Sequence, residues 1–342
     1  MITLGIETSC DETSFAVVRD GKKVLSNVVA TSLAQHRPYG GIIPEIASRT
    51  HLEYALPCLE TALKEARLKL ADVDLVAVTQ GPGLMGSLLV GVSAAKALAL
   101  ALDKPVVGVD HVIAHLYAAF LSEPKLKFPF LGLVVSGGHT MLIEMKSARR
   151  YRILGRTRDD AAGEAFDKVA KILGLGYPGG PEIDRLAKGE DTNRFYFTRP
   201  YLSHDSLDFS FSGIKTAVLY TVERHPKKHR LGMKDKKGIA AGFQEAVCET
   251  LVQKTLKASD SNRLPTIVVG GGVSANTRLK SLFTAASKKN KLRVVFPSMA
   301  LCQDNAAMIA ALGEASYREG RRDGFDMVAY PEFNYQEFQD GN

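Results

Sequence analysis

The two halves of the chain repeat one order of elements. Residues 4–18 read as an apolar strand, a small polar turn and a second apolar strand, and residues 130–144 repeat this order. Residues 75–87 and 265–276 each run from a buried strand through glycines into a helix. The repetition predicts a duplicated α/β fold, in which two related α/β domains surround a central cleft that holds the ligand.

The length of the chain agrees with two domains. A chain of 342 residues is long enough for two domains that each have a substantial core. The first set of elements is complete near residue 125. We therefore expect an N-terminal α/β domain over residues 1–125 and a C-terminal α/β domain over residues 126–342, the second with a helical insertion around residues 163–259.

Further elements follow from local patterns. Pro44 suits the first turn of a long helix, which we expect to end near Leu68. The other expected elements are a strand near residues 24–30, a turn at 176–184, and a short strand and turn at 208–215.

His111 and His115 have a spacing that suits metal binding. Residues 105–110 predict a buried strand ending at Asp110, a residue type that caps the start of a helix. Histidines four positions apart on a helix lie on one face, so both imidazoles can bind one ion. The alternative is that both are interior side chains whose polar atoms are satisfied within the protein.

The same segment lacks the residue that a zinc protease needs. The HExxH signature of such proteases places a general base directly after the first histidine, and this chain has Val112 there. We therefore expect a bound ion to orient or polarise a substrate. Asp304 lies at a second junction between a strand and a helix, and it is the right type of residue for a third ligand.

Two kinds of turn suit phosphate or metal-phosphate binding. The first turn concentrates oxygen atoms and backbone N–H groups, although a polar hairpin turn has the same composition; its polar residues are Glu7, Thr8, Ser9, Asp11 and Thr13. The glycines of residues 81–87 lead into a helix whose N-terminus can accept an anion. In the second half, glycines around Asp167 and Asp184 permit close approach of a ligand, and both carboxylates can accept hydrogen bonds from it.

Charge favours an anionic partner. The net charge is +7, and basic residues cluster at 149–158, 224–237 and 288–293. Composition does not distinguish tRNA from other polyanions. The four cysteines form no CxxC pair, no apolar run reaches the length of a membrane span, and no secretory leader is recognisable, so we expect a cytoplasmic protein without a membrane partner.

Taken in order, the motifs of the chain resemble those of one family. The resemblance is to the universal transferases of tRNA threonylcarbamoyladenosine modification, formerly called O-sialoglycoprotein endopeptidases, and specifically to the bacterial TsaD type. It covers nearly the whole chain, through the segments IETSCDETS, GGIIPEIASRTH, GPGL, HVIAH, SGGHT, GEAFDK, GYPGGPEID, FSFSGIKT, GGVSAN and QDNAAM.

The resemblance implies an actin-like ATPase (ASKHA) fold and assigns roles to particular residues. The implied metal ligands are His111, His115 and Asp304, which would hold one divalent ion, Fe(2+) or alternatively Zn(2+). The implied substrate-binding residues are Val134, Val135, Ser136, Gly137, Gly138, Asp167, Gly180, Asp184 and Asn276. Ser9 and the turn at 136–138 are candidates to position phosphate or carbamoyl oxygens. His139 is a candidate base, with fixing of its own turn as the alternative role.

The implied reaction is acyl transfer. The threonylcarbamoyl group of threonylcarbamoyl-AMP passes to N6 of the adenosine 3′ of the anticodon, in tRNAs that read codons beginning with A, and AMP is released. The implied partners are a catalytically inactive paralogue of the TsaB type, paired through helices of the N-terminal domain that include the region Pro44–Leu68, and a small P-loop ATPase of the TsaE type. Two alternatives remain at this point, an ATP-dependent small-molecule kinase or ATPase of the same fold and a non-enzymatic scaffold.

Overall fold

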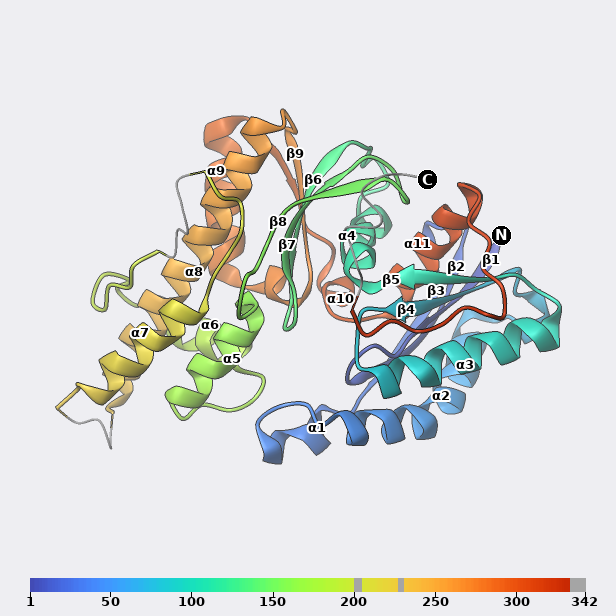
Figure 1. Cartoon of the computed structure of the whole chain (residues 1–342), viewed down its shortest axis with the longest axis horizontal. Helices are drawn as coiled ribbons and strands as arrows, with labels where there is room; N and C mark the ends of the chain where they lie inside the picture. The colour runs from blue at the N-terminus through green and yellow to red at the C-terminus, as the bar shows by residue number, and fades with distance from the viewer. Residues whose placement is uncertain (200–204, 227–230, 333–342) are drawn as a thin grey trace. The chain divides into compact units, whose positions relative to one another are not determined.

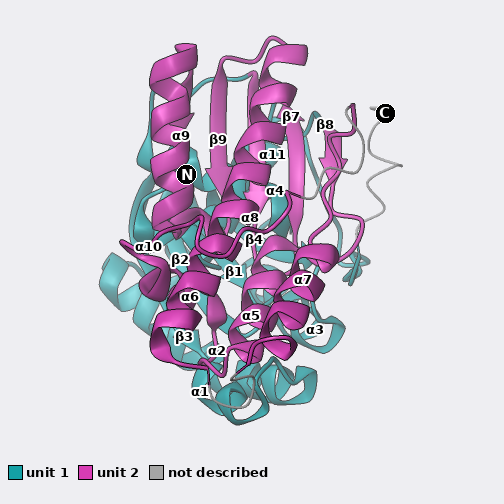
Figure 2. Cartoon of the chain, turned by 90° about the vertical axis from the view of Figure 1, so that its left-hand side faces the viewer, with its two compact units in different colours: residues 1–128, 146–151, 297–342 teal, residues 129–145, 152–296 magenta. Residues whose placement is uncertain are grey.

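The chain divides into two compact units, each built on one sheet (Figure 2). The computed structural model describes residues 1–199, 205–226 and 231–332. Unit 1 comprises residues 1–128, 146–151 and 297–342, and unit 2 comprises 129–145 and 152–296. The chain thus returns to unit 1 after residue 296. The expected boundary at residue 125 assigned all later residues to the second domain, and the structure differs in this respect.

The sheet of unit 1 has the strand order β3-β2-β1-β4-β5. Strand β1 pairs antiparallel with β2 and parallel with β4. The expected strand–turn–strand at the N-terminus and the strand near 24–30 are confirmed. The strands are β1 (Ile2–Glu7), β2 (Glu12–Arg19), β3 (Lys23–Thr31), β4 (Leu75–Gly81) and β5 (Val106–Asp110).

The sheet of unit 2 repeats this topology. Its order is β8-β7-β6-β9-β10, and β6 pairs antiparallel with β7 and parallel with β9, as β1 does with its own neighbours. The predicted duplication of the fold is therefore confirmed. The strands are β6 (Phe130–Val135), β7 (Thr140–Met145), β8 (Tyr151–Arg156), β9 (Thr266–Gly270) and β10 (Arg293–Val295).

Helices cover both faces of the unit 1 sheet (Figure 1). Leu4 and Ile6 alternate along β1 and are buried in the core that also contains buried residues of α2 and α3. On the other face α11 packs against β1, because Gly5 has no side chain; a Cβ there would lie 2.1 Å from the Ala306 carbonyl oxygen. The helices are α1 (Leu33–His36), α2 (Pro44–Ala66), α3 (Met85–Leu102), α4 (His111–Ser122), α10 (Met299–Cys302) and α11 (Ala306–Arg318).

The glycines of residues 81–87 lead into helix α3, as predicted. It begins at Met85, and its 18 residues are apolar enough to cross a membrane by length and composition alone. The expectation that no apolar run reaches this length was wrong. The helix packs against β4 and α2, and Leu88, Val92 and Ala95 are buried on that side, so one face of the helix belongs to the core of unit 1.

The described residues of unit 2 form five further α-helices, and two segments differ from expectation. The segment 179–184 is helical rather than a turn, because Asp167 accepts hydrogen bonds from the first N–H groups of that helix. Residues 208–215 form no strand; Phe209 makes one isolated bridge, and a helix begins at Ser212. The helices are α5 (Ala162–Ile172), α6 (Gly179–Ala187), α7 (Ser212–Glu223), α8 (Met233–Ser261) and α9 (Thr277–Asn290).

Candidate functional site

Helix α4 presents two histidines from its first and second turns. Asp110 caps the helix, since its Oδ1 accepts hydrogen bonds from the N–H groups of Val112 (2.7 Å) and Ile113 (3.0 Å). The helix therefore begins at His111, as predicted. The ring centroids of His111 and His115 lie 4.7 Å apart, and both side chains are buried.

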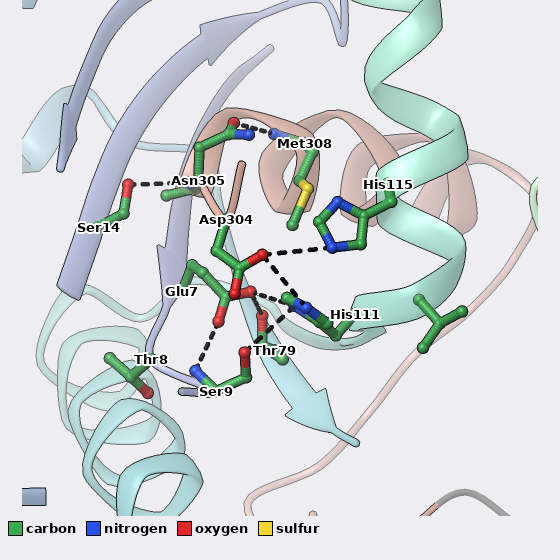
Figure 3. Close-up of polar contacts among 12 residues, drawn as sticks. Glu7, Thr8, Ser9, Ser14, Thr79, His111, His115, Asp304, Asn305 and Met308 are labelled. Carbon is green, nitrogen blue, oxygen red and sulfur yellow. Dashed lines mark hydrogen bonds and ion pairs between the residues drawn. The ribbon is translucent and has the colours of Figure 1, made fainter. Parts of the chain in front are cut away.

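Asp304 faces both histidines (Figure 3). Its Oδ1 lies 3.3 Å from His115 Nε2 and 3.6 Å from His111 Nε2. The next residue, Asn305, caps α11 by accepting from Met308 N, and Ala306 N donates to Ser14 Oγ on β2. The start of α11 thus fixes the carboxylate opposite the imidazoles.

The three side chains fit a divalent metal ion. One ligand atom from each lies within 4.8 Å of the others. His115 is buried, yet neither ring nitrogen has a hydrogen-bond partner among the described residues, because its contact with Asp304 is close enough for an ion pair but lacks hydrogen-bond geometry. Two imidazoles and a carboxylate suit several divalent ions, so the donor set does not define which one binds.

Glu7 forms a second layer behind His111. Its Oε2 lies 2.9 Å from His111 Nδ1 and accepts from Thr79 Oγ1 at 2.6 Å, and its Oε1 accepts from Ser9 N at 2.5 Å. A histidine that donates its Nδ1 proton to a carboxylate keeps the Nε2 lone pair available to a metal. Burial lowers the pKa of His111, but the charges of Glu7 and Asp304 and the hydrogen bond to Glu7 raise it to about 9.

The sequence identified Glu7 only as one of several oxygen donors in a polar turn. Its position behind the candidate metal ligand His111 depends on contacts with residues about 70 and 100 positions away in the sequence. The local signal was an acid at the end of the otherwise apolar strand β1. Such an acid is buried with the strand and needs partners.

Ser9 lies beside His111, and its backbone is tied on both sides. Its Oγ is 3.3 Å from His111 Nδ1, and its carbonyl oxygen accepts from Leu84 N at 2.8 Å. Gly83 permits this approach, since a Cβ there would lie 2.6 Å from the Ser9 carbonyl oxygen. The polar turn after β1 and the glycine turn after β4 therefore support each other.

His139 and Ser136 close the turn between β6 and β7 in unit 2. Ser136 N donates to the His139 carbonyl oxygen, and His139 N donates to Ser136 Oγ. A Cβ on Gly137 or Gly138 would meet no atom within 4 Å, so this turn is open on that side. Val134 and Val135 are fully buried in β6. The backbone of His139 thus helps to fix its turn.

The other candidate substrate-binding residues of unit 2 lie at or contact helix N-termini. Asp167 accepts from the N–H groups of Gly179 and Gly180 at the start of α6, and burial raises its pKa despite these bonds. Asp184 accepts from Thr277 N and Oγ1 at the start of α9. Asn276 caps α9 through Leu279 N. Asp167 thus also stabilises the start of α6, and Asp184 and Asn276 also stabilise the start of α9.

The three basic clusters differ in how far acids neutralise them. Arg152 pairs with Glu144, and Arg158 pairs with Asp208. Lys227, Lys228 and Arg230 lie outside the described residues. In the third cluster, the side chains at the end of α9, at positions 288–291, are exposed.

The fold belongs to the ASKHA class of actin-like ATPase domains. A similar solved structure is the full-length HypF protein in its phosphate- and nucleotide-bound form, with a TM-score of 0.62 and 14% identity over 93% of this chain and 46% of that one. Another is component A of the Acidaminococcus fermentans (R)-2-hydroxyglutaryl-CoA dehydratase, with a TM-score of 0.54 and 14% identity over 93% and 99%. At this identity, both show the fold alone.

Within this class, sequence comparison defines the family. Residues 23–311 match the family model TsaD, tRNA N6-adenosine threonylcarbamoyltransferase. The transferase of that name from Thermosipho africanus is 49% identical and covers 97% of this chain and 99% of its own length; the one from Trichlorobacter lovleyi is 52% identical over 96% and 95%. The chain belongs to the TsaD family and is a transferase.

Proposed function

We propose that the protein transfers the threonylcarbamoyl group of threonylcarbamoyl-AMP to N6 of the adenosine 3′ of the anticodon, in tRNAs that read codons beginning with A. AMP is the leaving group. The observation that supports the proposal is a sequence identity of about 50%, over nearly the whole chain, with transferases named for this modification. Adenylate leaves readily, so the protein has mainly to align a weakly nucleophilic amine with the carbonyl carbon.

In unit 1, His111, His115 and Asp304 would hold the ion. When bound, the ion supplies a Lewis acid for an oxygen of the threonylcarbamoyl group. Glu7 orients His111 through the Nδ1 hydrogen bond, and Ser9 Oγ is placed to contact a substrate oxygen beside it. The buried setting of these groups strengthens their electrostatic interactions with the substrate. We propose Fe(2+) as the ion, with Zn(2+) as the alternative.

In unit 2, the nucleotide part of the donor is the proposed ligand. In the open turn at 136–138, Gly137 and Gly138 would offer their backbone N–H groups to the phosphate, and Gly180 leaves room at the start of α6. Asp167, Asp184 and Asn276 would contact the sugar and the base. His139 is retained as a candidate base, in addition to its role in the turn.

The proposed protein partners are a TsaB-type paralogue and a TsaE-type ATPase. Large apolar side chains are exposed on two adjacent helices of unit 1, namely Leu52 and Leu56 on α2 and Met85 and Leu89 on α3. Such a patch on a surface helix is typical of a binding interface. We propose that the paralogue covers it, and that the complex works on tRNA in the cytoplasm.

The deciding experiment follows radiolabelled threonine from threonylcarbamoyl-AMP to tRNA in the presence of the partner proteins. The wild-type protein should label a tRNA that reads codons beginning with A, and His111→Ala should reduce the rate at least a hundredfold, because the ion is lost. Asp260→Asn, at an exposed position of α8, is the control and should retain the wild-type rate. Equal labelling by His111→Ala would refute the metal role, and no labelling by the wild type would refute the reaction.

A further inference from the structure

Gln244 is a buried polar residue in the middle of α8 that the proposed function does not use. It is 5% exposed, and its Oε1 accepts a hydrogen bond from Asn276 Nδ2 at 2.7 Å. Helix α8 packs against both α6 and α9 within unit 2 (Figure 2). Gln244 therefore lies next to a candidate substrate-binding residue, Asn276, and on a helix that packs against α6 and α9.

The hydrogen-bond network defines which way both amides point. Leu279 N can only donate, so the atom of Asn276 that faces it at 3.0 Å is the acceptor Oδ1. Cys248 Sγ contacts the same Oδ1 at 3.6 Å. Asn276 Nδ2 must then face Gln244, and Gln244 must present Oε1 to it. Neither amide can be flipped without placing two donors or two acceptors together.

The Nε2 group of Gln244 remains as a donor. No described residue accepts a hydrogen bond from Nε2. Ser274 Oγ, before α9, also has no partner but is sealed from solvent, whereas Nε2 is not among the sealed atoms. Because the two ends of an amide lie side by side, Nε2 is held next to the Asn276 amide. A donor that is fixed, largely buried and without a protein partner is suited to a ligand acceptor.

We propose that Gln244 is a ligand-contacting residue of unit 2, whose Nε2 donates a hydrogen bond to an acceptor atom on the base or ribose of an adenosine nucleotide. The inference rests on the proposed nucleotide site of unit 2 and extends it. Gln244 then has two roles, since Oε1 orients Asn276 while Nε2 contacts the ligand directly. An experiment must therefore distinguish the contact of Nε2 with the ligand from the orientation of Asn276 by Oε1.

The test measures binding of AMP to the whole protein by calorimetry. Gln244→Met has similar volume but no donor, and should lower AMP affinity about tenfold. Gln253→Met makes the same change at an exposed position of α8 and should leave affinity unchanged. If Gln244→Met does not fold, Gln244→Asn replaces it, because it keeps the amide but withdraws it by one methylene group; the same tenfold loss is expected.

The same substitution in a second variant distinguishes a direct contact of Gln244 with the ligand from orientation of Asn276 by Gln244. Asn276→Ser keeps a side chain that can cap α9 but removes the amide that Gln244 orients. Adding Gln244→Met to Asn276→Ser should lower AMP affinity about tenfold again, as expected for a direct contact. A loss that appears only when Asn276 is present, or no loss in either background, overturns the contact.

Gly180→Val tests the nucleotide site independently of Gln244. A Cβ at Gly180 meets no protein atom within 4 Å, so the valine should fold normally and project into the space left for the ligand. We expect it to abolish AMP binding. If the wild type does not bind AMP, or if Gly180→Val binds like the wild type, the nucleotide site itself is refuted together with the Gln244 contact. If Gly180→Val fails to bind while Gln244→Met binds normally, only the Gln244 inference is refuted.

Discussion

Glu7 and His111 are joined by a 2.9 Å contact between Oε2 and Nδ1, although 104 positions separate them in the sequence. The pair connects the end of β1 to the start of α4. It sets which nitrogen of His111 faces Asp304, and it therefore determines the geometry of the candidate metal site.

Replacing Glu7 by glutamine should weaken metal binding without removing a ligand. The amide keeps the size of the side chain but loses the charge that favours the Nδ1–H tautomer of His111. Loss of such a partner costs about 10- to 100-fold in metal affinity, which competition with a chromophoric chelator measures. Glu53→Gln, at an exposed position of α2, is the matched control. Unchanged affinity in Glu7→Gln would show that His111 needs no orienting partner.

Metal binding should stabilise the wild type against heat. An ion present at a hundred times its dissociation constant adds about 2.7 kcal/mol to the free energy of unfolding. Titration with Zn(2+) should therefore raise the midpoint of thermal unfolding, and Asp304→Asn should abolish most of the rise. Asp260→Asn should respond like the wild type. A rise of equal size in Asp304→Asn would place the ion elsewhere.

Gly83→Ala should disturb the turn that carries Ser9. The new Cβ would lie 2.6 Å from the Ser9 carbonyl oxygen and 3.0 Å from its Cα, and backbone atoms cannot move aside as a flexible side chain would. We expect a loss of about 1–3 kcal/mol in the free energy of unfolding and a lower transfer rate. Gly41→Ala, where a Cβ meets nothing within 4 Å, should be neutral in both assays. Equal stability of the two variants would contradict the close approach.

The ionised carboxylate of Asp159 should stabilise unit 2 at neutral pH, and this stabilisation should be lost at acid pH. Burial raises the pKa of Asp159, but hydrogen bonds from Ser210, Ser212 and the backbone at the start of α7 outweigh burial and lower it below 3.8. A carboxyl with a lowered pKa in the folded state contributes stability above its unfolded pKa, and that contribution is lost as the pH falls through the lowered value.

Asp159→Asn should therefore unfold more easily than the wild type at pH 7. The difference should shrink as the pH falls below about 4, where the wild-type carboxyl becomes protonated. Denaturant titrations across this range measure the difference, with Asp260→Asn as the control. A gap that stays constant with pH would mean that the charge of Asp159 has no part in holding α7.

Charge reversal in the second basic cluster should weaken tRNA binding. Changing Lys227, Lys228 and Arg230 to Glu should lower affinity and reduce its dependence on salt concentration, because fewer counterions are then released. Reversal of Lys288, Lys289 and Lys291 tests a cluster of the same size at the C-terminal end of α9. Affinity that is unchanged over a range of salt concentrations would exclude the second cluster from the tRNA surface.

The sequence predicted the duplication and the start of α4, because strand alternation, glycine turns and the Asp110 cap are local signals. It also identified the three metal-binding candidates, His111 and His115 from their spacing and Asp304 from its place at a junction between a strand and a helix. Two structural features depend on contacts between residues that are separated in the sequence, and no local sequence pattern predicts them. Asp167 makes 179–184 helical by capping a helix twelve residues away, and α11 returns to β1 through the space that Gly5 provides.

The return of the chain to unit 1 bears on how the metal site forms during synthesis. His111 and His115 leave the ribosome early, and their partner Asp304 is made almost two hundred residues later, after the whole of unit 2. A nascent chain that ends before Asp304 holds only two of the three candidate ligands, and a fragment consisting of residues 1–128 has the same deficit. The candidate metal site can therefore be completed only after the whole of unit 2 has been translated.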